Sequence, residues 1–477
     1  MIKIQRFLLK NWDYLGVVFF VISFSSFSIF RKFAWGDDWA FISDYRRGGS
    51  AVRVEHYSGY RPILQKIMDV SFGNISNYEH LIFLRVLSAI GMAVLTVLVM
   101  KNLEKYGYSR LVKLAIGLGL NMLPTFWIYT NWSSTFVYPW VCVISILSLM
   151  LFSKNKFISI LLLVVAFMIY QPTAVFSVFL MFANYLRIRK IPHLYSNYFG
   201  TLILSACISL ILSKFINNSF QVPAKARTGF LSDPIEIVQK IIWLVTRPLA
   251  LSFRPFIVES QGIFPFTLMA AGFLLSIAGL LEFSNKMRDL KLLAGIGIFY
   301  IFGLLPIIPI AENQIEFRIL PTTSVMGLLL VLIGVQSLQK KIKLSNSFVA
   351  IIMIISISGT GLYSQSKIQE IFIKPFEKNR TFLLEKSLGK NLNEVIVVID
   401  YNLTWPQRNY IGALSVISDF QMPWVPIGEV SQVLGINESQ IQVVASRPIE
   451  NLKNALIIDL NQVRDSLRVN FKQVGRY

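Results

Sequence analysis

Long apolar runs, separated by short polar segments, fill the chain up to about residue 363. About eleven of these runs approach the roughly 20 residues that a helix rising about 1.5 Å per residue needs to cross a bilayer. This pattern is typical of an α-helical polytopic membrane protein. The predicted spans lie near 14–32, 81–100, 111–130, 136–152, 157–170, 173–187, 197–214, 264–282, 292–311, 318–337 and 347–363.

The pattern changes in the last part of the chain. Residues 395–400 and 456–459 form short apolar runs that each end in Asp, which is typical of buried strands. Segments near 379–389 and 407–419 have the spacing of helices. The sequence therefore predicts a small α/β domain over residues 364–477.

Composition and charge agree with a membrane protein, because 54% of the 477 residues are hydrophobic and 15% are charged. The predicted transmembrane domain, residues 1–363, holds 33 basic and 15 acidic residues, against 13 and 11 in residues 364–477. The basic excess lies in alternate short loops, as the positive-inside rule expects of cytoplasmic loops, so no nucleic-acid partner is expected. The basic N-terminus precedes an apolar run without a cleavage site, which predicts a retained signal-anchor helix whose N-terminus is cytoplasmic. An odd number of spans then puts residues 364–477 outside the cytoplasm.

Two longer segments, 34–80 and 217–262, fall on the predicted outer face. The first mixes aromatic and charged residues with short apolar stretches, so it predicts helices at the membrane interface. Within the second, residues 241–251 are too few to span and indicate a re-entrant or surface-lying segment. The basic residues Arg227 and Arg254 in this segment are candidates for contact with phosphate or anionic lipid head groups.

The adjacent acids Asp37 and Asp38 follow directly after the first span. Charged side chains are costly near hydrocarbon, so these two residues are candidate functional groups. A positioned carboxylate can take the proton of an attacking hydroxyl, and a neighbouring acid can raise its pKa or share a metal ion with it. A helix cap beside a solvated acid is the alternative interpretation.

Three further polar segments fall on the same predicted face: residues 55–62, the turn at 170–173, and the turn at 312–318. An arginine in such a place can bind a lipid phosphate or simply pair with a loop acid. Arg85, near the outer start of the second span, is expected to extend toward the membrane surface. The candidate substrate-binding residues in these segments are His56, Tyr60, Arg61, Gln171, Glu312, Glu316 and Arg318.

The motifs GDDWAF, DYRRGG, SGYRPILQKIMD, YQPT and FRILP resemble those of the GT-C superfamily of membrane glycosyltransferases. The chain looks most like the bacterial and phage O-antigen glucosyltransferases that modify serotype. The resemblance covers roughly residues 10–340. The Gly-Arg position of the family corresponds here to Tyr60-Arg61, a departure that puts the family role of Arg61 in doubt.

The resemblance implies a polyprenyl-phosphate-sugar donor, carrying glucose or another hexose. It implies inverting transfer to a lipid-linked or surface glycan such as O-antigen of lipopolysaccharide. The reaction is expected at the outer face of the bacterial inner membrane, beside membrane lipids. The catalytic acid falls in the first outer loop, at Asp37 or Asp38, with Asp38 favoured. A divalent metal, Mg or Mn, held by these two acids stays open.

Two other interpretations remain. A transporter or flippase of lipid-linked sugars places polar groups near the bilayer midplane, often between paired repeats. A glycan polymerase or ligase is expected to concentrate its function in a large late loop. The early acidic pair, and the gathering of polar candidates at one predicted face, favour the transferase.

Overall fold

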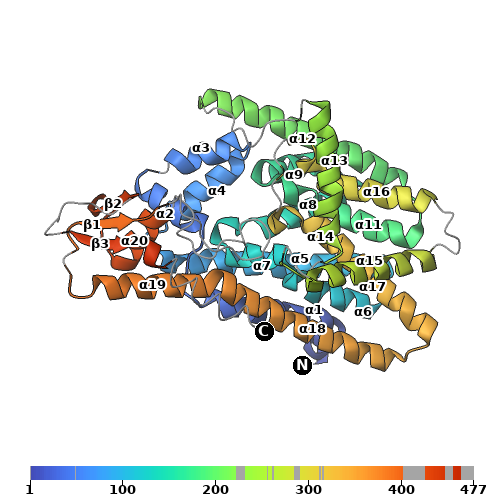
Figure 1. The fold of residues 1–477 in the computed structure, drawn as a ribbon. Coiled ribbons are helices and arrows are strands. Elements are labelled where there is room, and N and C mark those ends of the chain that lie inside the picture. The colour runs from blue at the N-terminus through green and yellow to red at the C-terminus, as the bar shows by residue number, and fades with distance from the viewer. Residues whose placement is uncertain are drawn as a thin grey trace.

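The computed structural model describes residues 2–48, 50–221, 231, 233–254, 256–259, 263–283, 290–310, 313, 316–390, 392–400, 425–445 and 455–463. A helical bundle forms the body, and a small sheet lies at one end of it (Figure 1). Every predicted apolar run contains a helix. These helices are α1 (Ile2–Ile29), α5 (Leu81–Lys105), α6 (Arg110–Met122), α7 (Pro124–Asn131), α8 (Tyr138–Phe152), α9 (Lys156–Ile169), α10 (Gln171–Ala174), α11 (Ser177–Ile188), α12 (His193–Ser219), α15 (Ile263–Phe283), α16 (Leu290–Leu304), α17 (Pro321–Ile342) and α18 (Asn346–Ile368).

Among the described residues, five helices are long and apolar enough to cross a membrane. A sixth results if α6 and α7, bent by 51° at their junction, count as one span. The bend has a local cause, because Pro124 lacks an N–H and keeps the preceding Leu123 extended at ψ 135. The chain is thus mainly helical with membrane-spanning helices, and the count of eleven spans stays a prediction.

Buried hydroxyl groups join four helices inside the bundle. Ser148 Oγ lies 2.9 Å from Ser159 Oγ and 3.1 Å from Tyr198 Oη. Tyr198 Oη also lies 3.0 Å from Ser177 Oγ, and the Ser177 N–H donates to Ser145 Oγ at 2.9 Å. These five side chains, called here the hydroxyl cluster, bond to one another and so link α8, α9, α11 and α12.

The segment 34–80 forms short helices, as predicted: α2 (Asp37–Arg46), α3 (Ser50–Ser58), α4 (Pro62–Phe72) and the 3₁₀ turn η1 (Tyr78–His80). Gly36 precedes α2 with φ 55, a conformation that glycine adopts without strain. Pro62 begins α4, where its missing N–H is not needed. These features place Asp37 and Asp38 in the first turn of α2.

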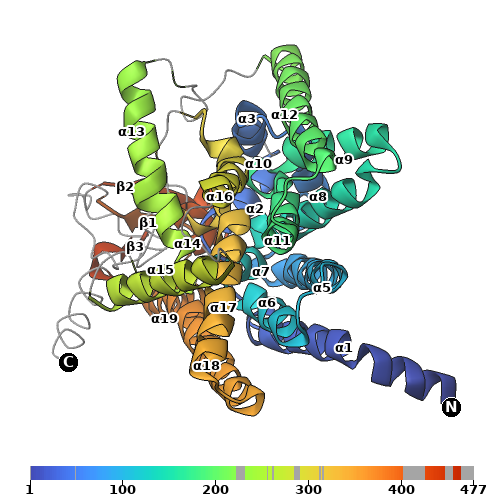
Figure 2. The same cartoon turned by 90° about the vertical axis from the view of Figure 1, so that its right-hand side faces the viewer.

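The segment 217–262 contains α13 (Pro234–Leu244), the π turn η4 (Val245–Leu249) and α14 (Ala250–Ser252). Helix α13 lies on the opposite side of the bundle from α1 (Figures 1 and 2). It exposes Ile235, Val238 and Ile241. With 11 residues, α13 does not reach span length, so a re-entrant or surface-lying segment stays the prediction for this region.

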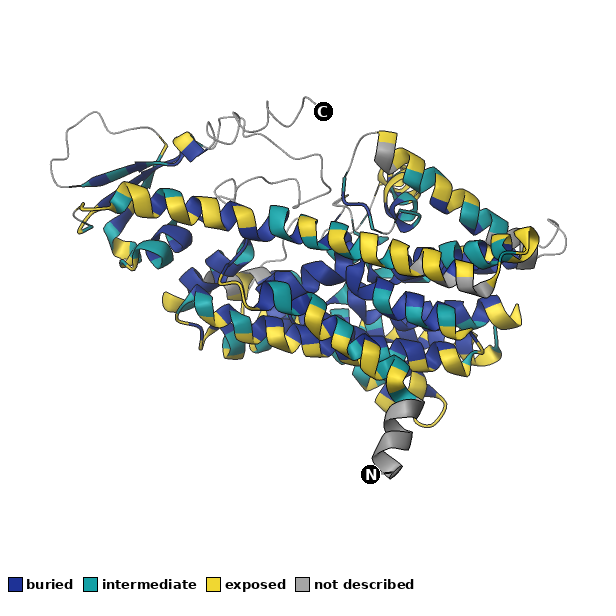
Figure 3. Ribbon diagram, turned by 90° about the horizontal axis from the view of Figure 1, so that it is seen from below, coloured by how far each residue is buried: buried dark blue, intermediate teal, exposed yellow. Residues whose placement is uncertain are grey.

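The bundle continues into the C-terminal part without a break in helical structure. The π turn η7 (Gln369–Ile373) joins α18 to α19 (Lys374–Ser387). Together they form one long rod with many exposed residues (Figure 3). The predicted domain boundary at residue 363 therefore falls inside α18, and a separately folded domain stays a prediction.

Three parallel strands form the sheet in the order β2-β1-β3: β1 (Val395–Val398), β2 (Ile441–Val444) and β3 (Leu456–Asp459). The predictions of β1, β3 and the helix near 379–389 are confirmed. Strand β2 was not predicted, and the predicted helix at 407–419 lies outside the described residues. Helix α20 (Pro426–Leu434) lies beside α2 at this end of the bundle (Figure 1).

Candidate functional site

Asp38 is fully buried, and its carboxylate accepts three backbone hydrogen bonds. The N–H of Ser134 donates at 2.8 Å, and the N–H groups of Ser133 and Trp35 donate at 3.3 Å. Burial raises the pKa of Asp38 to about 7, although Arg85 and the backbone donors act in the opposite direction. Asp38 therefore fixes the loop before α2 to the turn that follows α7.

Arg85 binds backbone carbonyls near Asp38, whereas Asp38 binds backbone amides. Its guanidinium donates to the carbonyls of Arg31 at 3.2 Å and Asn131 at 3.3 Å, and to that of Phe33. The expectation that Arg85 extends to the membrane surface is wrong, because this residue is 1% exposed. Carbonyls of the loop after α1 and of the last residue of α7 give the buried cation its acceptors, and Asp38 lies near enough to act on it.

Asp37 stands one residue away in a different environment. It is half-buried at the start of α2, where a helix N-terminus favours a carboxylate. Its charge acts on Arg318 and on Tyr138. The two acids therefore differ in environment, because backbone donors enclose Asp38 whereas the charge of Asp37 acts on the Arg318 guanidinium.

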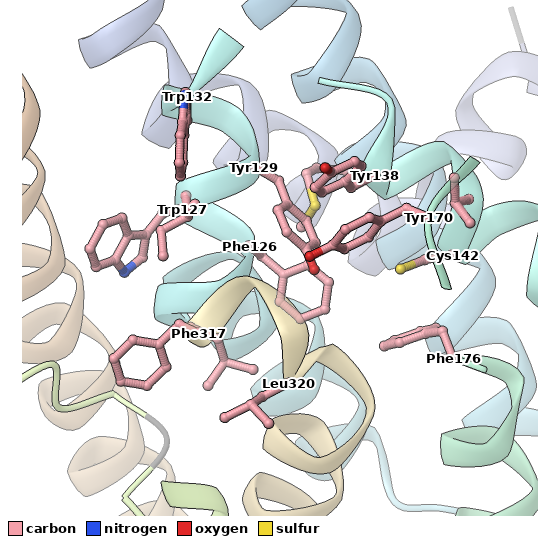
Figure 4. Packing of buried hydrophobic residues seen from close by; sticks show 14 of the residues in the cluster. Phe126, Trp127, Tyr129, Trp132, Tyr138, Cys142, Tyr170, Phe176, Phe317 and Leu320 are labelled. Carbon is pink, nitrogen blue, oxygen red and sulfur yellow. The ribbon is translucent and has the colours of Figure 1, made fainter. Parts of the chain in front are cut away.

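Arg318 lies in the turn η6 (Phe317–Ile319), just before α17. The backbone of this turn is held by two side chains of α7, because Thr125 Oγ1 donates to the Phe317 carbonyl at 2.7 Å and Tyr129 Oη donates to the Arg318 carbonyl at 2.5 Å. Figure 4 shows Phe317 and Leu320 of this region together with the aromatic residues of α7.

The Arg318 guanidinium pairs with the Glu316 carboxylate and lies 4.7 Å from the ring centroid of Trp132. Burial lowers the pKa of Arg318, but the Glu316 carboxylate and further neighbours raise it above its ordinary value. The side chain is 23% exposed, so a permanent cation remains within reach of solvent.

A second arginine approaches from the start of α4. Arg61 Nε donates to Gln171 Oε1 at 3.4 Å, and the guanidinium lies 5.0 Å from the ring centroid of Tyr170. Gln171 Nε2 donates in turn to the Tyr60 carbonyl at 3.2 Å. The rings of Tyr170 and Tyr138 stack with centroids 3.8 Å apart (Figure 4).

These contacts bring together residues from five parts of the chain. Arg61 and Arg318 both act on Tyr138 and Tyr170, and Asp37 and Glu316 act on Arg318. The group contains two carboxylates, two guanidinium groups, an amide and two phenols. We call it the acid–arginine cluster: Asp37, Arg61, Tyr138, Tyr170, Gln171, Glu316 and Arg318.

The remaining predicted residues lie elsewhere. His56 is buried, and its Nδ1 lies 2.9 Å from Gln65 Oε1. Burial, together with the charge of Arg61, lowers the pKa of His56 to about 4, so the ring is neutral and links α3 to α4. Tyr60 contributes its carbonyl, in a backbone with φ 57. Arg227 and Glu312 lie outside the described residues.

Arg254 belongs to a different electrostatic neighbourhood. Burial and Arg247 lower its pKa, and the carboxylate of Glu259 raises it. Glu259 itself pairs with Lys367 at 3.2 Å and accepts a 2.6 Å hydrogen bond from Tyr363. The charges that act on Arg254 therefore come from Arg247 and Glu259, which are not members of the acid–arginine cluster.

The predicted metal site at Asp37 and Asp38 can be compared with the groups around these acids. No three His, Cys, Asp or Glu side chains come together in the part of the chain that the structure describes. Asp38 is surrounded by N–H donors, and Glu316 is paired with Arg318. These donors and this cation compete with a metal ion for the oxygens of Asp38 and Glu316, and a divalent metal held by Asp37 and Asp38 stays a prediction.

Sequence reasoning missed several residues that shape this site. Trp132 connects Arg318 to Trp35, whose ring lies 4.7 Å from it in an edge-to-face arrangement. Tyr138 was not singled out because an aromatic residue at the end of an apolar span is common. An arginine inside an apolar run was a usable signal for Arg85, since such residues usually face the bundle interior.

A scan against protein-family models finds no match for this chain, and a search of curated proteins finds no similar sequence. The assignment of function therefore depends on the residues and their geometry.

Proposed function

We propose that the chain is an inverting membrane glycosyltransferase that moves a hexose, such as glucose, from a polyprenyl-phosphate donor to a glycan acceptor. One observation carries this proposal: the charge of a carboxylate at a helix start, Asp37, acts on a permanent cation, Arg318, in the same cluster. A glycosyl transfer from a lipid phosphate needs both charges, one for each end of the reaction. The outer face of a bacterial inner membrane and an O-antigen acceptor are part of the same proposal.

In the proposed reaction, an acceptor hydroxyl attacks the anomeric carbon of the donor sugar. Its proton passes to the Asp37 carboxylate as the new C–O bond forms. The bond between the sugar and the phosphate breaks, and its electron pair leaves with the polyprenyl phosphate. Arg318 stabilises the charge that grows on this leaving group, and Arg61 is the second cation of the cluster. A phosphate leaving group needs a cation more than it needs a general acid.

The same geometry gives Asp38 and Arg85 a supporting role. Asp38 holds backbone amides and Arg85 holds backbone carbonyls on the same two segments, so the pair fixes the first turn of α2. They would act on catalysis through the position of Asp37. Replacing Asp38 is therefore expected to affect folding as well as activity, whereas Asp37→Asn is expected to affect activity alone.

The test is sugar transfer by the purified full-length protein in lipid nanodiscs, with synthetic polyprenyl-phosphate hexoses and product detection by mass spectrometry. Asp37→Asn should lower kcat by about 10²–10⁴-fold, the usual contribution of a general base. The matched control is Asp233→Asn, because Asp233 also begins a helix, α13, but caps it through a 2.8 Å bond to the Ile235 N–H. Wild-type turnover in Asp37→Asn would refute the base assignment. The absence of transfer with every donor and acceptor would refute the function.

A further inference from the structure

The long C-terminal helix changes its winding where it passes the acidic segment. Its π turn, Gln369–Ile373, lies between α18 and α19. A π turn holds an extra residue, so it rotates the following helix by about 100° relative to a regular continuation. Single π turns are rare and occur often at functional sites, which makes the contacts of this one informative.

Two phenylalanines at this turn contact the tryptophans that flank the acids. Phe372 lies 5.0 Å from Trp35, and Phe376 lies 5.9 Å from Trp39, measured between ring centroids. All four side chains are at most 2% exposed. Trp35 and Trp39 stand immediately before and after Gly36-Asp37-Asp38, so the C-terminal helix packs against both ends of the acidic segment.

The contacts extend beyond these four rings. Phe372 also lies 5.9 Å from Trp127 of α7, the helix that holds the Arg318 turn. The C-terminal helix therefore touches both halves of the site, the acid side through Trp35 and the arginine side through α7. Such a shared contact fixes the two halves relative to each other.

Helix α20 contacts α2 from the other direction. Gly428 lies so close that a Cβ added there would sit 2.9 Å from the Trp39 carbonyl oxygen and 3.4 Å from Ser43 Cβ. An ion pair between Arg47 and Glu438, 3.1 Å long, adds to this interface, but the arginine is 61% exposed. Exposed pairs of this kind contribute little, so the backbone contact at Gly428 is the more important one.

We infer that the π turn η7 with α19 (residues 369–387), together with α20 (residues 426–434), acts as a positioning element for Asp37. The rings of Phe372 and Phe376, and the close approach at Gly428, hold the first turn of α2, from which the charge of Asp37 acts on Arg318. None of these residues touches the reacting groups, so they are positioning residues. The catalytic part of this inference depends on the proposed function, whereas its structural part does not.

The structural part is tested by hydrogen exchange of the α2 amides in the full-length protein in nanodiscs. Phe372→Ala, Phe376→Ala and Gly428→Ala should each speed exchange across residues 37–46 by roughly tenfold or more, because local opening becomes easier. Leu384→Ala is the matched control, since Leu384 is on α19 but 41% exposed. Gly428→Ala removes no side chain and places a better helix former in α20, so general unfolding is not its expected effect. Unchanged α2 exchange in a folded Gly428→Ala protein overturns the inference, whatever Phe372→Ala does.

The catalytic part is tested with transfer kinetics. Phe376→Ala should lower kcat by on the order of tenfold and leave the donor KM unchanged, because a small displacement of a reacting group slows the chemical step more than binding. Phe376→Leu should recover part of this loss. The loss should also vanish in an Asp37→Asn background, since both substitutions then act on the same group. Fully additive losses overturn the inference. If the wild type transfers no sugar, the proposed function fails, and the exchange experiment still decides the structural part.

Discussion

Two buried polar regions of this molecule have opposite chemistry. The hydroxyl cluster inside the bundle contains only neutral groups, and each hydroxyl bonds to another or to a carbonyl at 2.6–3.1 Å. The acid–arginine cluster and the neighbouring Asp38–Arg85 pair hold charges at the end of the bundle that carries α2. Neutral groups that satisfy one another link helices together. Charged groups held inside a membrane protein cost stability, so their presence indicates a functional site.

The comparison also bears on the transporter alternative. A transport path across a membrane is expected to place charged or ion-binding groups deep between helices. The hydroxyl cluster joins four bundle helices, and its members are neutral groups bonded to each other. We therefore expect substitutions in the two regions to differ in kind, and the following predictions test that difference.

The largest expected effect is on stability, from Arg85→Met. Methionine keeps the apolar contacts of the arginine stem but leaves the Asp38 carboxylate buried without its cation. Breaking a buried charge pair in this way typically costs about 3–5 kcal/mol. Thermal unfolding in nanodiscs, followed by circular dichroism, measures the loss. A Tm equal to that of the wild type would show that Arg85 does not support the fold as described.

The second prediction concerns Arg318→Gln, which removes the cation but keeps side-chain polarity. We expect kcat to fall by about 10²–10³-fold, the usual cost of losing a donor aimed at developing charge. Arg318→Lys should recover part of the rate. Arg110→Gln is the control, because the Arg110 side chain also pairs with an acid, Asp13, but is 53% exposed.

A double variant separates two consequences of losing Arg318. Glu316 is 7% exposed on its side chain and would lose its pairing with the guanidinium in Arg318→Gln. Glu316→Gln/Arg318→Gln should regain stability while its turnover stays low. If turnover returns together with stability, the arginine acts on the fold rather than on the leaving group.

The third prediction uses pH. The pKa of His56 is about 4 in the folded protein, below its ordinary value of 6.5, so the unfolded chain takes up the proton first as pH falls. The neutral ring therefore contributes fully above about pH 6.5, and this stability is lost between 6.5 and 4, by at most about 3 kcal/mol. The measurement is the Tm difference between wild type and His56→Gln, which should shrink as pH falls from 7.5 to 5.

Comparison with the variant is essential in this experiment because protonation of Asp38 changes the stability in the opposite direction. Its folded pKa, about 7, lies above its ordinary value of 3.8, so its burial costs stability above pH 7 and this cost is relieved as pH falls. Asp38 titrates in both proteins and cancels from the difference. A Tm difference that stays constant with pH would contradict the neutral, buried state of His56.

The smallest effect is expected in the hydroxyl cluster. Tyr198→Phe removes the hydroxyl that bonds to Ser148 and Ser177, and should cost about 1 kcal/mol without changing kcat or KM. Tm and transfer rates measured on the same preparation test both statements. A large loss of turnover with little loss of stability would mean that the bundle interior takes part in function, and the distinction between the two regions would fail.

Much of the architecture could be predicted from local pattern. Long apolar runs give helices because a helix satisfies its own backbone groups, and each of the eleven predicted spans contains a helix. Strands β1 and β3 were visible as fully apolar runs. Strand β2 was not, because only Ile441 of its four residues is buried, and a partly exposed edge has a weaker pattern.

The sequence predicted which segments contribute to the candidate site, but not which of their residues interact. The sequence by itself placed an acidic pair after the first apolar run and an arginine before a late one, because polar residues at the ends of spans are local features. It did not distinguish Asp37 from Asp38, since neighbouring residues share the same local pattern. Tertiary structure alone decided that Asp38 binds the turn after α7, that Arg85 points inward, and that the charge of Asp37 acts on Arg318. The physical reason is that these roles depend on backbone donors and acceptors supplied by segments about 50–280 residues away, and no local pattern encodes such partners.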